Sequence, residues 1–435
     1  MRKNYQNIPA GVSEATRLAV PEQVIVSMAE IAASAREGLL ALAVGTGLQV
    51  MHAMFASDVE ALCGPAGRHN PEQTGYRHGT ETGSVTLGGR RVPVRRPRVR
   101  ASDGSTELPL PSYELFSSTE VLGAMAVERM LAGLSTRRYP VGLEPVGQQV
   151  ADQARSTSKS AVSRKFVAAT ETALAELLAA DLSGLDLVAL MIDGVYFAEH
   201  LCVVALGIDI DGTKHLLALA EGSTENATVV TDLLVGLRDR GLEVTRLVLV
   251  VIDGSKALAA ASKRVFDRPV IQRCQVHKIR NVIDKLPQRL KSVVERRMRT
   301  AYHASSAVAA EADLLALARE LERTHPGAAA SLREGMAETL TVLRLEVPPM
   351  LAKTLRSTNA IESMIAICRD HSRNVKRWRD GQMALRWCAA GMVEARGQFR
   401  RVVGHLHLPR LRQALEAEFT DGSAAVGHTD RVTAA

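Results

Sequence analysis

Two blocks of uninterrupted aliphatic residues stand out in the hydrophobic pattern of the chain, and each runs directly into Asp-Gly. The first is LVALMI (187–192), followed by Asp193-Gly194, and the second is LVLVVI (247–252), followed by Asp253-Gly254. Apolar runs of about six residues bounded by turn residues are typical of strands that are buried on both faces of a sheet. A carboxylate at the end of such a strand is costly to bury without a partner. The pattern therefore marks Asp193 and Asp253 as candidate site residues.

The segments between and after these blocks predict the topology of a sheet. Further strands are expected at 201–209, 215–220 and 269–274, and helices at 226–242 and 255–265. The order is strand, strand, strand, helix, strand, helix, strand, with one Asp ending the first strand and the other ending the fourth. A right-handed crossover would bring the two strand ends together, about 4.8 Å apart, which is close enough for two carboxylates to share hard cations. This is the order of an RNase H-like domain, although either Asp-Gly pair alone would be an ordinary turn.

Helical patterns surround this block on both sides. Apolar residues recur at three and four positions in 21–63 and in 118–133, and the latter segment opens with a Ser/Thr cap and ends at Gly133. Residues 285–346 alternate charged and aliphatic positions without a strand pattern, which indicates a helical insertion, and 384–418 are also helical in pattern. The tail from Asp421 is small and polar, which is typical of disorder.

A basic stretch at 75–100 predicts a twisted hairpin, with Gly88-Gly89 as its turn and alternating Arg and Val after it. Six arginines fall within eleven positions, and no acidic residue stands among them: Arg90, Arg91, Arg95, Arg96, Arg98 and Arg100. Together with a net charge of +7 and a pI near 9.3, the run favours contact with the phosphates of a polyanion. A solvated basic face is the alternative.

A second candidate DNA-binding segment lies at 147–182. A short helix, a polar turn (156–158) and a second helix have the length and polarity of a helix-turn-helix, and a linker helix with ordinary surface lysines is the alternative. The polar residues near the start of the second helix are Lys159, Ser160, Ser163, Arg164 and Lys165.

The five cysteines, at 63, 202, 274, 368 and 388, are scattered and include no Cys-x-x-Cys pair, which favours a reducing compartment. The N-terminal segment lacks the apolar core of a signal peptide, and the uncharged stretch 38–57 is interrupted by Gln49 and His52, which favours an ordinary helix over a membrane span. Cys274-x-x-His277 has a spacing seen in zinc sites, but a structural zinc needs four ligands and no second pair lies nearby. A buried Cys beside a hydrogen-bonding His is therefore the favoured interpretation.

A third carboxylate follows Pro348-Pro349. Asn359 can cap a helix, which would put Glu362 at the third helical position, where a Glu commonly completes a capping box. Two-metal sites also need a third carboxylate, and a basic run follows on the same segment. Both interpretations of Glu362 remain open at this point.

Assembled in order, these residues resemble the mutator-type transposases of bacterial insertion sequences. The segments that carry the resemblance are Gly75-Tyr76-Arg77, 133–140, 158–166, Asp193-Gly194, Asp253-Gly254, Cys274-x-x-His277 with Lys278 and Arg280-Asn281, and 357–363. The resemblance implies an RNase H-like domain interrupted by a helical insertion, in which Asp193, Asp253 and Glu362 form an Asp-Asp-Glu triad that holds two divalent ions. Mg²⁺ or Mn²⁺ fits such a set because both prefer oxygen ligands.

The resulting expectation is an α/β protein whose RNase H-like core has an all-helical insertion and follows a mainly helical DNA-binding region with a small basic hairpin. The expected parts are an N-terminal helical region (1–70), a DNA-binding region (71–182), the first part of the core (183–284), the insertion (285–350), the C-terminal helices of the core (351–419) and a disordered tail (420–435). The expected partners are double-stranded DNA, as element ends and target, and further copies of the chain in the bacterial cytoplasm. Cys274, His277, Lys278 and Arg280 are expected beside the site. A stand-alone RNase H-like nuclease and a domesticated DNA-binding protein are the alternative functions.

Overall fold

The computed structural model describes residues 35–68, 73–143, 146, 148–155, 157–222 and 226–429. The chain divides into two compact units. The first is formed by the chain up to Ala126 together with Thr136–Lys165, and the second by Val127–Ser135 together with the chain from Phe166. Among the described helices, none is both long and apolar enough to cross a membrane.

The first unit is built on the predicted hairpin. Strands β1 (Gly75–Leu87) and β2 (Arg90–Ala101) pair antiparallel, and Gly88 and Gly89 take positive φ angles of 53° and 74°, as a two-residue hairpin turn requires. Two elements that the sequence did not predict, β3 (Glu107–Leu108) and α3 (Pro111–Ser117), accompany the hairpin. Helix α2 (Ala35–Cys63) packs on it and buries Phe55. The predicted helical region 21–63 is thus confirmed from residue 35, and 21–34 lie outside the described residues.

Three further α-helices lie in the sequence between α3 and the first strand of the second unit. Helix α4 (Glu120–Leu131) confirms the helix predicted at 118–133, and it ends before Gly133, whose φ of 97° the helix could not continue. After the short η2 (Tyr139–Gly142), helices α5 (Gln148–Gln153) and α6 (Lys159–Ala179) follow. The predicted succession of a short and a longer helix is therefore present, with only six residues in the first.

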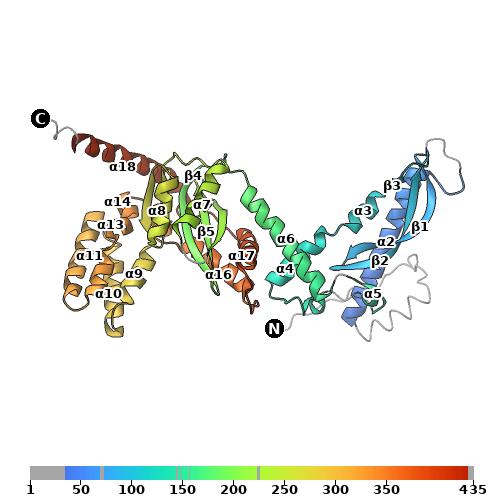
Figure 1. Cartoon of the computed structure of the whole chain (residues 1–435), viewed down its shortest axis with the longest axis horizontal. Helices are drawn as coiled ribbons and strands as arrows, with labels where there is room; N and C mark the ends of the chain where they lie inside the picture. The colour runs from blue at the N-terminus through green and yellow to red at the C-terminus, as the bar shows by residue number, and fades with distance from the viewer. Residues whose placement is uncertain are drawn as a thin grey trace, which may run out of the picture. The chain divides into compact units, whose positions relative to one another are not determined.

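The second unit contains a five-stranded sheet in the order β6-β5-β4-β7-β8. Figure 1 labels two of its central strands, β4 and β5. Its strands and crossover helices match the order that the sequence predicted: β4 (Leu187–Phe197), β5 (His200–Asp209), β6 (Lys214–Gly222), α7 (Ala227–Asp239), β7 (Val248–Ile252), α8 (Lys256–Val265) and β8 (Pro269–Arg273). Strands β4, β5 and β6 pair antiparallel, whereas β4, β7 and β8 pair parallel. The result is a mixed α/β architecture.

The sheet is buried on both faces, which is why its strands are almost uninterruptedly apolar. On one face, Leu190 and Ile192 pack with residues of α7 and α8 such as Leu234 and Leu258. On the other face, alternate residues such as Met191 pack against the C-terminal helices. These are α16 (Asn359–Ser372), α17 (Gly381–Arg396) and α18 (Leu408–Thr429), the last preceded by η3 (His405–His407).

Two details of this unit differ from the sequence prediction. Asp193 does not end its strand, because β4 continues to Phe197 by pairing antiparallel with β5 from Gly194↔Val203 to Phe197↔His200. The tail, expected to be disordered from 420, is helical through Thr429 as part of α18, and 430–435 lie outside the described residues.

The predicted insertion at 285–346 is helical and has a core of its own. Its helices, with those on either side, are α9 (Gln275–Ile283), α10 (Gln288–Ala301), α11 (Ala307–Glu322), α12 (Pro326–Arg333), α13 (Met336–Thr339), α14 (Thr341–Arg344) and α15 (Pro349–Leu355). Met298, Leu314 and Leu332 are fully buried within it. The helices pack locally because each presents an apolar stripe that the sheet does not cover.

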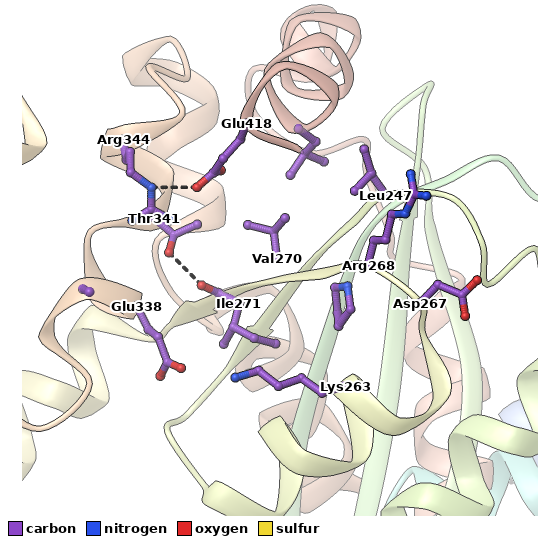
Figure 2. Close-up of a pocket in the computed structure, with 13 residues that line it drawn as sticks. Leu247, Lys263, Asp267, Arg268, Val270, Ile271, Glu338, Thr341, Arg344 and Glu418 are labelled. Carbon is purple, nitrogen blue, oxygen red and sulfur yellow. Dashed lines mark hydrogen bonds and ion pairs between the residues drawn. The ribbon is translucent and has the colours of Figure 1, made fainter. Parts of the chain in front are cut away.

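The insertion also covers the edge strand β8. The hydroxyl of Thr341 donates to the carbonyl of Ile271 at 2.7 Å, and Arg344 donates to Glu418 of α18 at 2.7 Å beside a pocket of about 470 Å³. Figure 2 marks both contacts with dashed lines. An uncovered edge strand would offer free backbone groups to other chains. The contact with Thr341 therefore satisfies one of these groups and fixes the insertion against the sheet.

Candidate functional site

The structure brings the two predicted aspartates to neighbouring strands. The parallel pairing of β4 with β7 ends at Ile192↔Ile252, so Asp193 and Asp253 directly follow a matched pair. Side chains two positions apart in a strand lie on the same face of the sheet. Asp193 therefore shares the face of Met191, and Asp253 that of Val251, which is the face that packs against α16. This is the layer that carries Glu362.

Each aspartate accepts a local hydrogen bond that fixes its orientation. Asp193 Oδ1 accepts from the N–H of Gly194 at 2.8 Å, and Asp253 Oδ1 accepts from the N–H of Ser255 at 2.8 Å. The predicted Asp-Gly pairs thus serve different purposes. The first lies inside a strand, while Gly254, with a φ of 109°, turns the chain out of the sheet.

Electrostatics show that the acidic groups gather at one place. Burial raises the pKa of Asp193 to about 6, because only 8% of the residue is exposed and its charged form loses hydration. The N–H of Gly194 and the charge of His277 oppose this rise, whereas the negative charges of Asp253 and Glu362 add to it. The hydrogen bond from Gly194 and the charge of His277 therefore do not fully offset the cost of burying the negative charge of Asp193.

Glu362 is held by a side chain, and the capping box considered from the sequence is absent. The N-cap of α16 is Thr358, not Asn359, and no side chain accepts a hydrogen bond from the N–H groups of the first turn. Instead, the hydroxyl of Thr358 donates to Glu362 Oε1 at 3.0 Å. The capping interpretation was therefore wrong, and the carboxylate of Glu362 is left free of any helix-capping role.

Cys274 and His277 lie beside Glu362. The Cys274 sulfur, a ring nitrogen of His277 and a carboxylate oxygen of Glu362 lie within 4.8 Å of one another, and His277 Nε2 is 3.6 Å from Glu362 Oε1. Cys274 is fully buried and accepts hydrogen bonds from the N–H and the hydroxyl of Thr358, both at 3.4 Å. The predicted Cys-x-x-His segment thus adjoins the acidic residues through Thr358.

The charges of this pair are coupled to the carboxylates. Interaction with the nearby Cys274 sulfur raises the pKa of His277 to about 9 against the effect of burial, and the charges of Asp193 and Glu362 act in the same direction. Burial raises the pKa of the Cys274 thiol, but interaction with His277 and the hydrogen bonds from Thr358 outweigh burial and lower the pKa overall. His277 therefore supplies a positive charge next to Glu362. Three donor atoms could also hold a soft metal ion, but a closed structural zinc site takes four.

Two other residues expected near the site have different positions. Lys278 is buried and donates from Nζ to the carbonyls of Ser331 and Glu334, so it stabilises the C-terminal end of α12. Burial lowers its pKa to about 8, with Arg273 contributing. Arg280 is exposed. The structure therefore does not gather these two cations around the carboxylates.

Sequence reasoning missed two residues that organise the site. Thr358 links Cys274 to Glu362 and is fully buried. Arg273, at the end of β8, donates to the carbonyl of Gly254 and thereby holds the loop that follows Asp253. Its place directly before Cys274, at the end of a strand next to the Asp253 strand, was the signal that could have pointed to it.

The arginine run in the first unit divides into residues used internally and residues left exposed. Arg90 is buried and donates to Gly88, and Arg91 donates to the carbonyls of Ser84 and Ser117. Arg96 and Arg98 form ion pairs with Glu81 and Glu107. The run therefore does have acidic partners, contrary to the sequence interpretation, because the hairpin register and β3 bring carboxylates from outside it.

The remaining predicted DNA-binding residues of this unit differ in their exposure. Arg95 is exposed and donates only to the hydroxyl of Thr80 at 2.8 Å, and Arg100 has no carboxylate partner within the described part of the chain. At the start of α6, Lys159, Ser160 and Arg164 are exposed and Ser163 is half-buried, while burial lowers the pKa of Lys165. The segment before α6 pairs with β2 through Arg91↔Arg155.

Acidic groups on adjacent strands and a facing helix, in a chain with a separate basic hairpin unit, are the arrangement expected of a metal-dependent enzyme that acts on nucleic acid. Comparison with known families assigns the chain to a narrower class. The model of the Mutator family of transposases matches residues 21–402, so the chain belongs to this family.

Individual relatives agree with this assignment. The chain is 28% identical to a transposase for insertion sequence element ISRM5 of Rhizobium meliloti, over 84% of this chain and 90% of the relative. It is 30% identical to a transposase for element IST2 of Acidithiobacillus ferrooxidans, over 40% of this chain and 58% of the relative. A probable insertion-sequence transposase of Corynebacterium diphtheriae is 28% identical, over 54% and 67% of the two chains.

Proposed function

We propose that this chain is an active transposase that binds the ends of its insertion sequence and catalyses metal-dependent strand cleavage and strand transfer. The second unit would be its catalytic domain, of the RNase H-like type. The observation that carries the proposal is the gathering of Asp193, Asp253 and Glu362 on two matched strands and the helix that faces them. Burial raises the pKa of the Asp193 carboxyl, and the charges of Asp253 and Glu362 add to the rise.

The donor set fits divalent ions of the magnesium type. Carboxylate oxygens are the ligands that Mg²⁺ and Mn²⁺ prefer, and Asp193 is buried without a cationic partner at hydrogen-bonding distance among the described residues. Asp193, Asp253 and Glu362 would hold the ions. When bound, such ions lower the pKa of an attacking water or hydroxyl and offset charge on the leaving oxygen during displacement at phosphorus.

The protein's own residues have distinct parts in this proposal. The hydrogen bonds from Gly194 and Ser255 orient the two aspartates, and that from Thr358 orients Glu362. His277 places a positive charge beside Glu362, where it offsets repulsion among the carboxylates before a cation or DNA is present. No protein nucleophile is needed, because water or a DNA 3′-hydroxyl attacks the phosphorus.

DNA recognition is assigned to the first unit and the start of α6. Arg95, which is exposed, and Arg100, which is half-buried, have no carboxylate partner in the described structure, and Lys159 and Arg164 are exposed at the start of α6. Holding two element ends together requires at least two copies of the chain. Exposed apolar residues of α2, namely Leu42, Val50 and Met54, supply a surface for this association.

Strand-cleavage and strand-transfer assays with and without acceptor DNA test the proposal. Asp193→Asn and Asp253→Asn should bind DNA normally and lose more than about a hundredfold in cleavage rate, because bound ions supply several kcal/mol and each 1.4 kcal/mol is tenfold. Cleavage without joining would instead indicate a nuclease, and DNA binding without cleavage by the wild-type chain would indicate a DNA-binding protein. Normal cleavage by either variant would remove that residue from the site.

A further inference from the structure

A cleft that borders the helical insertion has a basic lining that the proposed chemistry does not use. It encloses about 890 Å³ in the second unit, between the start of α11, the loop before it, and the segment from α14 to α15. Its charged lining residues are Arg344, Arg356, Arg410 and Glu346. Arg344 is already paired with Glu418, which leaves Arg356 and Arg410 as cations without a carboxylate partner in the part of the chain that is described.

Arg356 is held in place by neutral groups. Its Nη1 donates to His303 Nε2 at 2.7 Å, and His303 Nδ1 lies 2.6 Å from the carbonyl of Arg299. A ring that accepts at Nε2 must donate from Nδ1, so His303 is the neutral tautomer that carries its proton on Nδ1. The imidazole thus orients the guanidinium but does not neutralise it.

The position of Arg356 makes an uncompensated charge costly. It is half-buried, and burial lowers its pKa, with the neighbouring Arg299 acting in the same direction. A guanidinium that loses water next to another cation gains most from an anion that binds both of its arms. Glu346 also lines the cleft but forms no ion pair with Arg356 or Arg410 in the described structure, so these two cations can take an anion from outside the chain.

The start of α11 contributes further donors to the same cleft. Ser306 caps this sixteen-residue helix and accepts from the N–H of Ala309 at 3.2 Å, while Ala307 and Val308 carry N–H groups that the helix cannot pair internally. No acidic side chain stands in this first turn. Free N–H groups and the positive end of the helix dipole favour an anion here.

We propose that this cleft binds the phosphodiester backbone of DNA, as a contact additional to those of the basic hairpin. Arg356 and Arg410 bind phosphate, the first turn of α11 donates to phosphate, and the apolar wall of Val347, Pro348 and Ala352 contacts the sugars. The cleft adjoins the carboxylates through the backbone. The carbonyl of Arg356 accepts from the N–H of Gln275 at 2.9 Å, and Thr358, two residues later, holds Glu362. The insertion thereby gains a part in positioning the strand that reacts.

The test compares arginine variants of the full chain. Arg356→Gln with Arg410→Gln should weaken binding to a fluorescent duplex of arbitrary sequence, measured in EDTA, at least tenfold at low salt. It should also reduce the slope of log affinity against log salt by about one to two, since each phosphate contact contributes about 0.9. Arg323→Gln is the matched control, because Arg323 is exposed at the C-terminal end of the same α11 and has no carboxylate partner in the described structure. It should leave both affinity and slope unchanged.

Val308→Glu separates binding from folding. Val308 is 78% exposed, so the new side chain fits, and an acid in the first turn of a helix stabilises it. The variant should keep or raise the melting temperature and yet weaken DNA binding severalfold. If Arg356→Gln does not fold, the single variant Arg410→Gln is used in the same DNA-binding measurement.

The DNA contact at this cleft rests on the proposed function, but different experimental results would contradict the cleft and the function. Absence of strand cleavage by the wild-type chain would contradict the function. A wild-type chain that cleaves DNA, with an arginine double variant that keeps the wild-type affinity and salt slope, would overturn the cleft as a DNA contact. An equal loss in Arg323→Gln would also overturn it, because the effect would then reflect net charge alone.

Discussion

The hydroxyl of Thr358 donates to Glu362 Oε1 at 3.0 Å and lies 3.4 Å from the sulfur of Cys274. Thr358 is fully buried, so this hydroxyl orients the carboxylate from inside the protein. Residues that orient metal ligands in this way typically contribute a factor of about 10–100 to metal affinity or activity.

Thr358→Val should therefore lower strand transfer about 10–100-fold. Valine has nearly the same shape as threonine but no hydroxyl, and the lost hydrogen bond costs only about 1 kcal/mol of stability. The measurement is the Mn²⁺ dependence of the transfer rate, which should shift to higher concentration. Thr358→Ser keeps the hydroxyl and should restore most of the rate. A valine variant with a wild-type Mn²⁺ dependence would show that Thr358 only packs.

Glu362→Gln should fold and bind DNA but fail in strand transfer. Because α16 has no side-chain cap, the substitution removes no capping hydrogen bond, and the amide can still accept from Thr358. Removing a negative charge also relieves repulsion with Asp193, so the melting temperature should stay the same or rise. Thermal unfolding, a gel shift and a transfer assay give the three results. Joining at the wild-type rate would mean that the third carboxylate lies elsewhere.

The free energy of unfolding of the ion-free protein should fall as the pH rises from about 4 to 6. The pKa of Asp193 is about 6 in the folded chain and 3.8 in its ordinary state, so the folded chain keeps a proton that the unfolded chain has lost in this window. The associated loss is at most about 3 kcal/mol above pH 6, at 1.36 kcal/mol per unit. Asp193→Asn should remove this part of the pH dependence and be more stable than wild type at pH 7. Denaturant unfolding in EDTA measures both, and an unchanged pH profile in the variant would contradict the assignment.

Metal binding should show the opposite dependence on pH. Divalent ions bind the deprotonated carboxylate, so the apparent Mn²⁺ affinity should rise with pH up to about 6 and then level off as far as Asp193 is concerned. Calorimetry in buffers of different protonation enthalpy would count the protons released. Release of none at pH 5 would show that Asp193 is already ionised there.

The hairpin arginines Arg95 and Arg100, which have no carboxylate partner in the described structure, should behave differently from the ion-paired Arg96 and Arg98. The double variant Arg95→Gln with Arg100→Gln should weaken DNA binding. It should also reduce the slope of log affinity against log salt by about one to two, the contribution of one to two phosphate contacts. Arg96→Gln with Arg98→Gln removes the same charge, yet these side chains are engaged with Glu81 and Glu107. The second pair should change the salt dependence less, as measured by fluorescence anisotropy. Equal effects would mean that only net charge matters.

The strand order and the position of the two aspartates could be predicted because uninterrupted apolar runs and Asp-Gly boundaries are local signals. The end of β4 was missed because Asp193-Gly194 was interpreted as the end of the strand, whereas pairing with β5 continues the strand to Phe197. The cap of α16 was misplaced by one residue because the Thr358 hydroxyl is used by Glu362 and Cys274, which only the folded chain brings together.

One error of the sequence interpretation was avoidable. A hairpin with Gly88-Gly89 at its turn pairs Leu87 with Arg90, and the same register continues to Glu81↔Arg96. Counting outward from the turn would have placed an acidic residue opposite the arginine run. The internal use of Arg90 and Arg91 could not be found this way, because it depends on packing against segments distant in sequence.

The chain passes between the two units three times, since Val127–Ser135 belongs to the second unit while the residues on both sides of it belong to the first. Within the second unit, the carbonyl of Leu131 lies 2.9 Å from His371 Nδ1, and Leu131 itself is buried. Truncation at one point therefore cannot yield an intact N-terminal fragment. A piece ending near residue 180 would keep 127–135 without His371 and most of the second unit, so separating the two units calls for a linker in place of 127–135 and not for a simple cut.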